Sequence, residues 1–161
     1  MEISFNKAEL EKLVEIAVMA DWVMTAHDTE DDERKDEYLK LIQKIFAFAW
    51  KNGMKKEIEH LEDIKEFFPD ENWEEGSLAR AFITEFEEKT FWDELVERLA
   101  ERELNRKLGN KQAGSFEEHM EIYEGFASTF GEEFAENGIE HLQVVKPEVK
   151  KPEAGKPARK R

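Results

Sequence analysis

NKAELEKLVEIAVMADWVMTA, residues 6–26, is the stretch that decides the fold. Asn6 and Glu9 stand three residues apart, the spacing of a capping box in which each side chain bonds a backbone N–H of the first turn. Apolar residues then recur at intervals of three and four, which is a helical period: Leu10, Leu13, Val14, Ala17, Ala20 and Met24. This pattern predicts an amphipathic helix ending near Ala26, with a wide apolar side that we expect to be buried in more than one direction.

Downstream of this helix, the same spacing predicts further helices over residues 38–51, 54–68, 78–86, 91–108 and 116–134. Gly53 and Gly138 follow two of them and suit helix ends, because glycine adopts the left-handed conformation without strain. Ser77 is a candidate N-cap, and Thr90 with Asp93 and Ser115 with Glu118 have the spacing of capping boxes. Residues 69–77 are expected to be a loop, and whether 78–108 is one bent helix or two stays open.

The fold class that follows is mainly α. We expect a single acidic, bundle-like domain of five to six helices over residues 1–145, followed by a disordered tail over residues 146–161. Gly125 and Gly131 fall inside the last predicted helix, where each costs about 1 kcal/mol relative to alanine. Close helix packing or a kink would account for them.

The tail differs from the rest of the chain in its charge. It repeats Lys-Pro every five residues and carries seven cations and two glutamates, a net +5: Lys146, Lys150, Lys151, Lys156, Arg159, Lys160 and Arg161. Because the whole chain has a formal charge of −15, residues 1–145 carry −20, from 17 basic and 37 acidic residues. Proline and the scarcity of apolar side chains predict a tail that does not fold alone.

Composition narrows the classes of function. The chain has no cysteine, which excludes a disulfide scaffold, a Cys-ligated zinc site and a thiol nucleophile. Residues 1–12 show no secretory signal, and the longest apolar run, residues 45–50, is far shorter than the about 20 residues of a membrane helix. We therefore expect a cytoplasmic protein that does not enter the membrane. Neither a phosphate-binding glycine loop nor a nucleophile elbow is present in the sequence.

An acidic cluster follows the first predicted helix. Carboxylate oxygens are the ligands that Mg²⁺ and Mn²⁺ prefer, so five residues are candidate metal ligands of a phosphohydrolase: Asp28, Glu30, Asp31, Glu33 and Asp36. The other interpretation is a helix start favoured by negative charge, with a solvated face.

The block FWDELVERLAERELNRKLG, residues 91–109, resembles one found in small acidic bacterial hypothetical proteins that also open with a long amphipathic helix. The resemblance is loose outside residues 7–50 and 91–109. It implies a prokaryotic cytosolic protein, and no known activity comes with it.

Three hypotheses of function remain. The preferred one is a non-enzymatic helical module without a cofactor, which binds a partner protein through its acidic body, its basic tail or both, with Trp73 and Trp92 as candidate anchors. Salt-sensitive attraction of the tail to RNA or DNA, masking of the body by the tail, and a homo-oligomer are open variants. The alternatives are the Mg²⁺- or Mn²⁺-dependent phosphohydrolase and a nucleic-acid mimic that occupies a basic partner.

Overall fold

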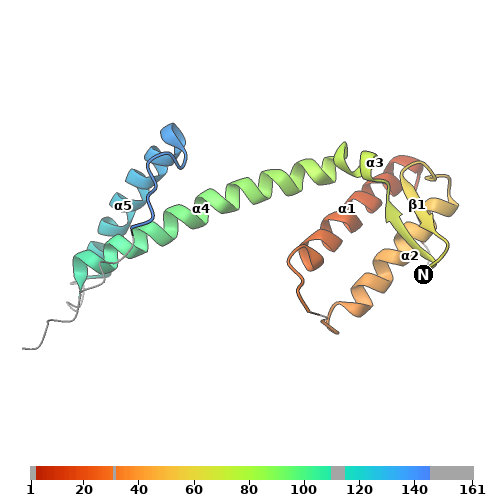
Figure 1. Ribbon diagram of the computed structural model, residues 1–161, viewed down its shortest axis with the longest axis horizontal. Helices are drawn as coiled ribbons and strands as arrows, with labels where there is room; N and C mark the ends of the chain where they lie inside the picture. Colours follow the sequence, from red (N-terminus) through yellow and green to blue (C-terminus); the bar gives the residue numbers. More distant parts are fainter. Residues whose placement is uncertain (1–2, 31, 110–114, 146–161) are drawn as a thin grey trace, which may run out of the picture. The chain divides into compact units, whose positions relative to one another are not determined.

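The protein is mainly helical, as predicted. A computed structural model describes residues 3–30, 32–109 and 115–145 (Figure 1). The elements follow in the order α1 (Lys7–Thr25), α2 (Asp36–Lys51), β1 (Ile58–Leu61), β2 (Glu66–Pro69), α3 (Glu71–Glu75), α4 (Leu78–Leu108) and α5 (Phe116–Asn137). Within the described ranges, no helix combines the length and the apolar character needed to cross a bilayer.

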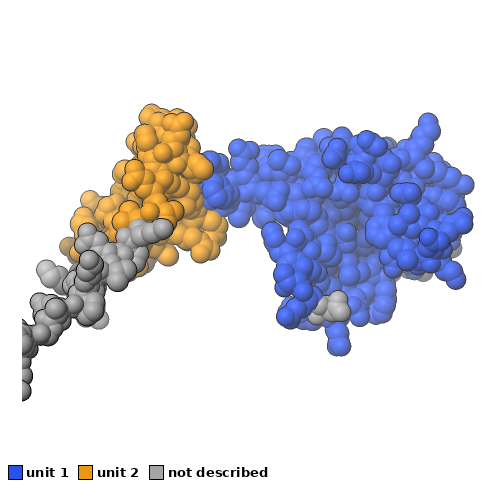
Figure 2. All heavy atoms as spheres, in the orientation of Figure 1, with its two compact units in different colours: residues 1–93 blue, residues 94–161 orange. Residues whose placement is uncertain are grey.

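The chain divides into two compact units, which we call unit 1 (Met1–Asp93) and unit 2 (Glu94–Arg161) (Figure 2). Unit 1 contains α1 to α3, the two strands and the first half of α4. Unit 2 contains the second half of α4 together with α5. The prediction of one acidic domain over residues 1–145 did not include this division, and the tail at 146–161 lies outside the described residues.

The ends of α1 and α2 are those that the sequence predicts. Glu9 N–H donates to Asn6 Oδ1 at 3.0 Å and Asn6 N–H donates to Glu9 Oε2 at 2.8 Å, which completes the capping box. After α2, Gly53 has a φ of 102°, a value that a residue with a Cβ rarely adopts. Because both helix ends are fixed locally, α1 and α2 present defined faces to each other.

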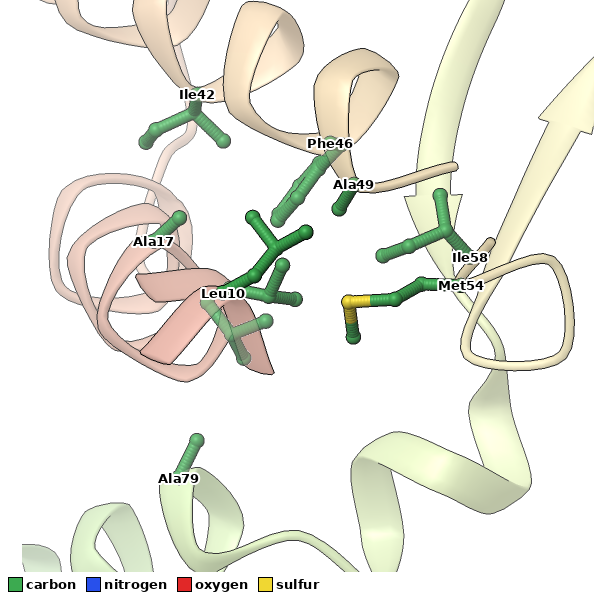
Figure 3. Close-up of a cluster of buried hydrophobic side chains, with 10 residues drawn as sticks. Leu10, Ala17, Ile42, Phe46, Ala49, Met54, Ile58 and Ala79 are labelled. Carbon is green, nitrogen blue, oxygen red and sulfur yellow. The ribbon is translucent and has the colours of Figure 1, made fainter. Parts of the chain in front are cut away.

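The core of unit 1 lies where α1 and α2 face each other and meet the hairpin and the start of α4. Figure 3 shows that its side chains come from all of these segments: Leu10, Val14, Ala17, Val18, Ile42, Phe46, Ala49, Met54, Ile58 and Ala79. The largest side chains that are fully buried are Phe46, Met54, Ile58 and Val14. Burying each such side chain contributes about 1.5–3 kcal/mol, so this cluster is the main source of the stability of unit 1.

Residues 54–68 do not form the predicted helix, and that prediction was wrong. They contain a β-hairpin in which β1 pairs antiparallel with β2, with His60 opposite Phe67. Burial along the strands alternates with a period of two, so Ile58 is buried whereas Leu61 and Phe68 are exposed. Lys65 in the turn has a φ of 58°, a left-handed conformation that ends any helix at this point.

A side chain of α2 completes the hairpin. Gln43 Nε2 donates to the Phe67 carbonyl oxygen at 2.9 Å, and Phe67 N–H donates to Gln43 Oε1 at 2.9 Å. The N–H and C=O groups of Phe67 therefore point away from β1. The single amide of Gln43 bonds both of them, as the backbone of a third strand would. The ring of Phe67 meets Trp50 edge-on and stacks on His60, with centroids 5.7 and 4.3 Å away.

We expect Gln43→Ala to lower the free energy of unfolding by about 1–3 kcal/mol, because it leaves two half-buried backbone groups of Phe67 without partners. Urea titration followed by circular dichroism measures the change. Gln43→Glu is the matched control: it keeps the acceptor for Phe67 N–H, so its loss should be the smaller one. Equal stability of Gln43→Ala and the unchanged chain would contradict this role.

The region between the hairpin and α5 also differs in part from the prediction. Residues 71–75, expected to be loop, form the short helix α3, whose N-cap Asp70 accepts a bond from Trp73 N–H at 3.0 Å. Ser77 caps α4 as predicted, since Arg80 N–H donates to its Oγ at 3.2 Å. Residues 78–108 form one continuous helix, so the capping box predicted at Thr90 was wrong, and Thr90 is an interior residue of α4.

Unit 2 is built from α5 and the second half of α4. The Ser115–Glu118 capping box that starts α5 is confirmed, with Glu118 N–H donating to Ser115 Oγ at 3.2 Å. Gly138, with a φ of 57°, ends the helix as predicted. Gly125 and Gly131 lie inside a continuous α5, and a Cβ built on either would meet no atom within 4 Å. The expectation that they mark close packing is therefore not met within the chain.

Candidate functional site

Two carboxylates of the acidic segment after α1, those of Asp28 and Asp32, are paired with cations of the same segment. Lys35 Nζ bonds both the carboxylate of Asp28 and the carbonyl oxygen of Met24. Arg34 holds Asp32 through two nitrogens, with Nη2–Oδ2 at 2.6 Å and Nε–Oδ1 at 2.8 Å. The Arg34 side chain and backbone N–H lower the pKa of Asp32 to about 2, so this carboxylate stays charged at any ordinary pH.

The predicted metal ligands are only partly brought together. Asp28, Glu30, Glu33 and Asp36 line one shallow hollow together with Lys35, whereas Asp31 lies outside the described residues. In the part of the chain that the structure describes, no group of three or more Asp, Glu or His side chains is arranged to hold a metal ion. Because Lys35 pairs with Asp28, the arrangement supports the interpretation as a charge-neutralised helix start rather than a Mg²⁺ or Mn²⁺ site.

Neither of the two candidate tryptophan anchors is fully exposed. Trp73 is half-buried and packs against the core of unit 1. Trp92 is also half-buried and meets the ring of Phe91 edge-on, with centroids 4.9 Å apart. The seven predicted partner-binding cations of the tail, Lys146 to Arg161, lie outside the described residues.

The surface feature that sequence reasoning missed is an apolar face on the first half of α4. Leu78, Phe82 and Phe86 recur every four residues, and their exposed fractions are 57%, 55% and 62%. We call these three residues the α4 face. Their helical spacing is the one expected of residues on a buried face. Instead, the buried side of this segment consists of Ala79 and Ile83, one position further round the helix.

A second apolar stripe lies on α2. Leu41 and Phe48 are exposed by 54% and 47% on the side of the helix away from Phe46, and Tyr38, one turn before Ile42, is 62% exposed near the helix start. Its flank carries Lys40, Lys44 and Lys51, so the charge next to this stripe is positive. On the α4 face, the charged residues three or seven positions after its members are Glu85, Lys89 and Asp93, two acidic and one basic.

The α4 face is anchored at its N-terminal end by polar contacts among α1, α3 and α4. Leu78 N–H donates to Glu15 Oε1 at 3.3 Å, and Arg80 Nη2 pairs with Glu74 Oε1 at 2.6 Å. Asp21 of α1 lies near Glu74. Burial first, and the charge of Glu74 second, raise the pKa of the Asp21 carboxyl.

This raised pKa predicts a pH dependence. Because the folded state binds a proton at Asp21 more readily than the unfolded state, the ionised group lowers stability above its folded pKa. The penalty fades as the pH falls towards the unfolded value near 3.8 and is absent below it. We expect Asp21→Asn to raise the urea midpoint at pH 7 and to have no such effect at pH 3. A lower midpoint for Asp21→Asn at pH 7 would show that the charge is stabilising instead.

Comparison with known proteins gives no match: no family model, curated protein or solved structure corresponds to this chain. The resemblance of residues 91–109 to small acidic bacterial proteins therefore stays a prediction.

Proposed function

We propose that the protein is a non-enzymatic interaction module, and that unit 1 uses the α4 face to bind a basic amphipathic segment of a partner protein. The observation that carries the proposal is the exposure of Leu78, Phe82 and Phe86 on one line. Contiguous exposed apolar groups are typical of docking surfaces, and large aromatic side chains supply much of the binding energy at such surfaces. An amphipathic helix would lay its own apolar stripe along this one.

The α4 face is supported from beneath by the core. Ala79 is fully buried and belongs to the core cluster, and Ile83 is 4% exposed. Both lie one residue after a member of the face, so the backbone that carries Leu78 and Phe82 is fixed by packing. A binding surface held in this way loses little conformational entropy when a partner docks.

Charge selects the partner. Residues 1–145 as a whole carry −20, and the charged residues that share this side of α4 by helical spacing are Glu85, Lys89 and Asp93, two acidic and one basic. Such a field attracts lysine- and arginine-rich segments and speeds their association, while it repels acidic ones. The partner that fits is therefore a protein segment with apolar anchors on one side and cations on the other.

A peptide titration tests this proposal. The probe is a fluorescent Leu/Lys amphipathic helix of about 18 residues, and its matched counterpart has Glu in place of Lys. We expect the Leu/Lys peptide to bind, with weaker binding as salt screens the charges, and the Leu/Glu peptide not to bind. Phe82→Ala/Phe86→Ala should weaken binding at least about tenfold, a loss of about 1.4 kcal/mol.

Tyr38→Ala/Phe48→Ala is the matched control, because it removes two equally exposed aromatic rings from the α2 stripe, whose flank is basic. It should bind the Leu/Lys peptide as the unchanged chain does. If the two double variants bind equally well, the peptide is held by charge alone and the α4 face is not the docking surface.

A further inference from the structure

Unit 2 is built on two helices, which bury few apolar side chains between them. Among its described residues, the buried apolar side chains are Ala100 and Leu104 of α4 and Phe134 of α5. Two helices alone cannot cover both apolar stripes, so stable helical domains add a second layer of helices. We therefore expect another helical surface to cover the apolar residues that stay half-exposed on each helix of unit 2.

On α4, the uncovered strip lies beside a row of arginines. Leu95 and Leu99 are half-exposed and stand one turn apart. Arg98, Arg102 and Arg106 follow the same spacing next to them, and their side chains are 77%, 49% and 64% exposed. Each arginine pairs within α4, with Glu94 or Glu103 at 2.7–2.9 Å. Exposed pairs of this kind contribute about 0–1 kcal/mol, so they can be exchanged for others at little cost.

On α5, the uncovered strip lies beside a row of glutamates. Met120 and Ala127 are half-exposed, and Gly131 extends their line by one turn. Glu117, Glu121 and Glu124 border this strip at intervals of four and three. Helix α5 contains seven glutamates and neither lysine nor arginine, whereas residues 94–108 of α4 hold four cations and four glutamates. The α5 strip is therefore bordered by glutamates, and the α4 strip by arginines that pair with glutamates of their own helix.

We propose that two copies of this chain associate through unit 2, with the α4 strip of one copy (Leu95, Leu99 and the three arginines) lying against the α5 strip of the other (Met120, Ala127, Gly131 and the three glutamates). A twofold axis makes the contact twice, because each copy offers both strips. Two helices from each copy then form a four-helix layer. The arginine and glutamate rows meet at its edges and oppose the repulsion between two acidic chains.

Gly131 supports this arrangement independently of charge. Inside a helix it costs about 1 kcal/mol relative to alanine, and a Cβ at this position would meet nothing within 4 Å in the single chain. A residue with no Cβ lets a second helix approach closely. Gly125 has the same open surroundings, but it lines the groove beside Lys107 of its own α4, with Phe126 and Thr129.

The test is a pair of charge reversals on the full chain, with mass measured by sedimentation velocity and helix content by circular dichroism. We expect the unchanged chain to be a dimer. Arg98→Glu/Arg102→Glu/Arg106→Glu and Glu117→Lys/Glu121→Lys/Glu124→Lys should each be a folded monomer, because every α4–α5 contact becomes repulsive. A mixture of the two variants restores opposite charges at both contacts and should form a heterodimer.

Three results would overturn the proposal: an unchanged chain that stays monomeric at high concentration, a reversed variant that still dimerises alone, or a mixture of folded variants that fails to associate. A chain ending at Val145 should dimerise like the full chain. If removal of residues 146–161 abolishes the dimer, the tail supplies the cations and the α4 strip does not.

A second pair of variants tests the contact without changing charge. Gly131→Leu should weaken the dimer at least about tenfold, because its side chain would separate the two helices. Gly125→Leu, at an exposed position on a different side of α5, should leave the dimer unchanged. If both variants dimerise as the unchanged chain does, the α5 strip is not the contact.

Discussion

Phe46→Ala is expected to destabilise unit 1 by about 3–5 kcal/mol, the usual cost of removing a buried phenylalanine and leaving a cavity. Phe46 is 2% exposed and stands between α1 and the hairpin in the core cluster (Figure 3). Because many domains of this size are stable by only about 5–15 kcal/mol, the variant should lose a large share of its stability. Urea titration monitored by tryptophan fluorescence would measure it.

Phe48→Ala is the matched control, since the same side chain is removed from the same helix two residues later. Phe48 is 47% exposed on the α2 stripe, so less surface is returned to water and no cavity forms. We expect a change below about 1 kcal/mol. Comparable losses for the two variants would mean that the buried and exposed sides of α2 have been assigned incorrectly.

Leu104→Asp is expected to be the second strongly destabilising substitution, and its effect should be limited to unit 2. Leu104 is 5% exposed on α4, and a carboxylate there would be buried without a partner. Together with the lost apolar contact, the cost should exceed about 3 kcal/mol, which is more than two loosely packed helices can supply. We expect α5 to lose its protection against amide hydrogen exchange while α2, in unit 1, keeps it.

Asn105→Asp provides the control for Leu104→Asp. It adds the same charge one residue later, at an exposed position, and should leave the protection of α5 unchanged. If Leu104→Asp removes protection from α2 and α5 together, the two units unfold as one and the division of the chain has no thermodynamic counterpart.

Helix ends were the part of the fold that the sequence predicted best. The Asn6–Glu9 and Ser115–Glu118 boxes and the glycines at 53 and 138 all stand where helices begin or end. Their signals are local, because a cap depends on hydrogen bonds within one turn. Thr90 shows the limit of such a signal: the same pattern inside α4 caps nothing, since the preceding turn already supplies the helical partners.

The hairpin could not be predicted in this way, because its strands are only four residues long. Over so short a span, Ile58, Leu61, Ile64 and Phe68 fit a helical period as well as an alternating one. The partner that stabilises β2 is Gln43, which lies 24 residues earlier in sequence. A contact of this separation leaves no trace in the local pattern.

The candidate site was missed for a related reason. Leu78, Phe82 and Phe86 have the spacing of a buried face, and spacing alone does not say how many apolar faces the other helices can cover. Here α1 covers the adjacent position, where Ala79 lies, and the three larger side chains remain exposed. In the acidic segment that the composition singles out, Asp28 is paired with Lys35 and Asp32 with Arg34.

The Gln43 amide has a consequence for solubility. An unpaired strand edge is a template onto which another chain can add a strand, and the growth of ordered aggregates begins with such additions. At Phe67 the amide already occupies both the donor and the acceptor that an incoming chain would need. Through one side chain of α2, the outer edge of β2 is thus closed at Phe67 to intermolecular strand pairing.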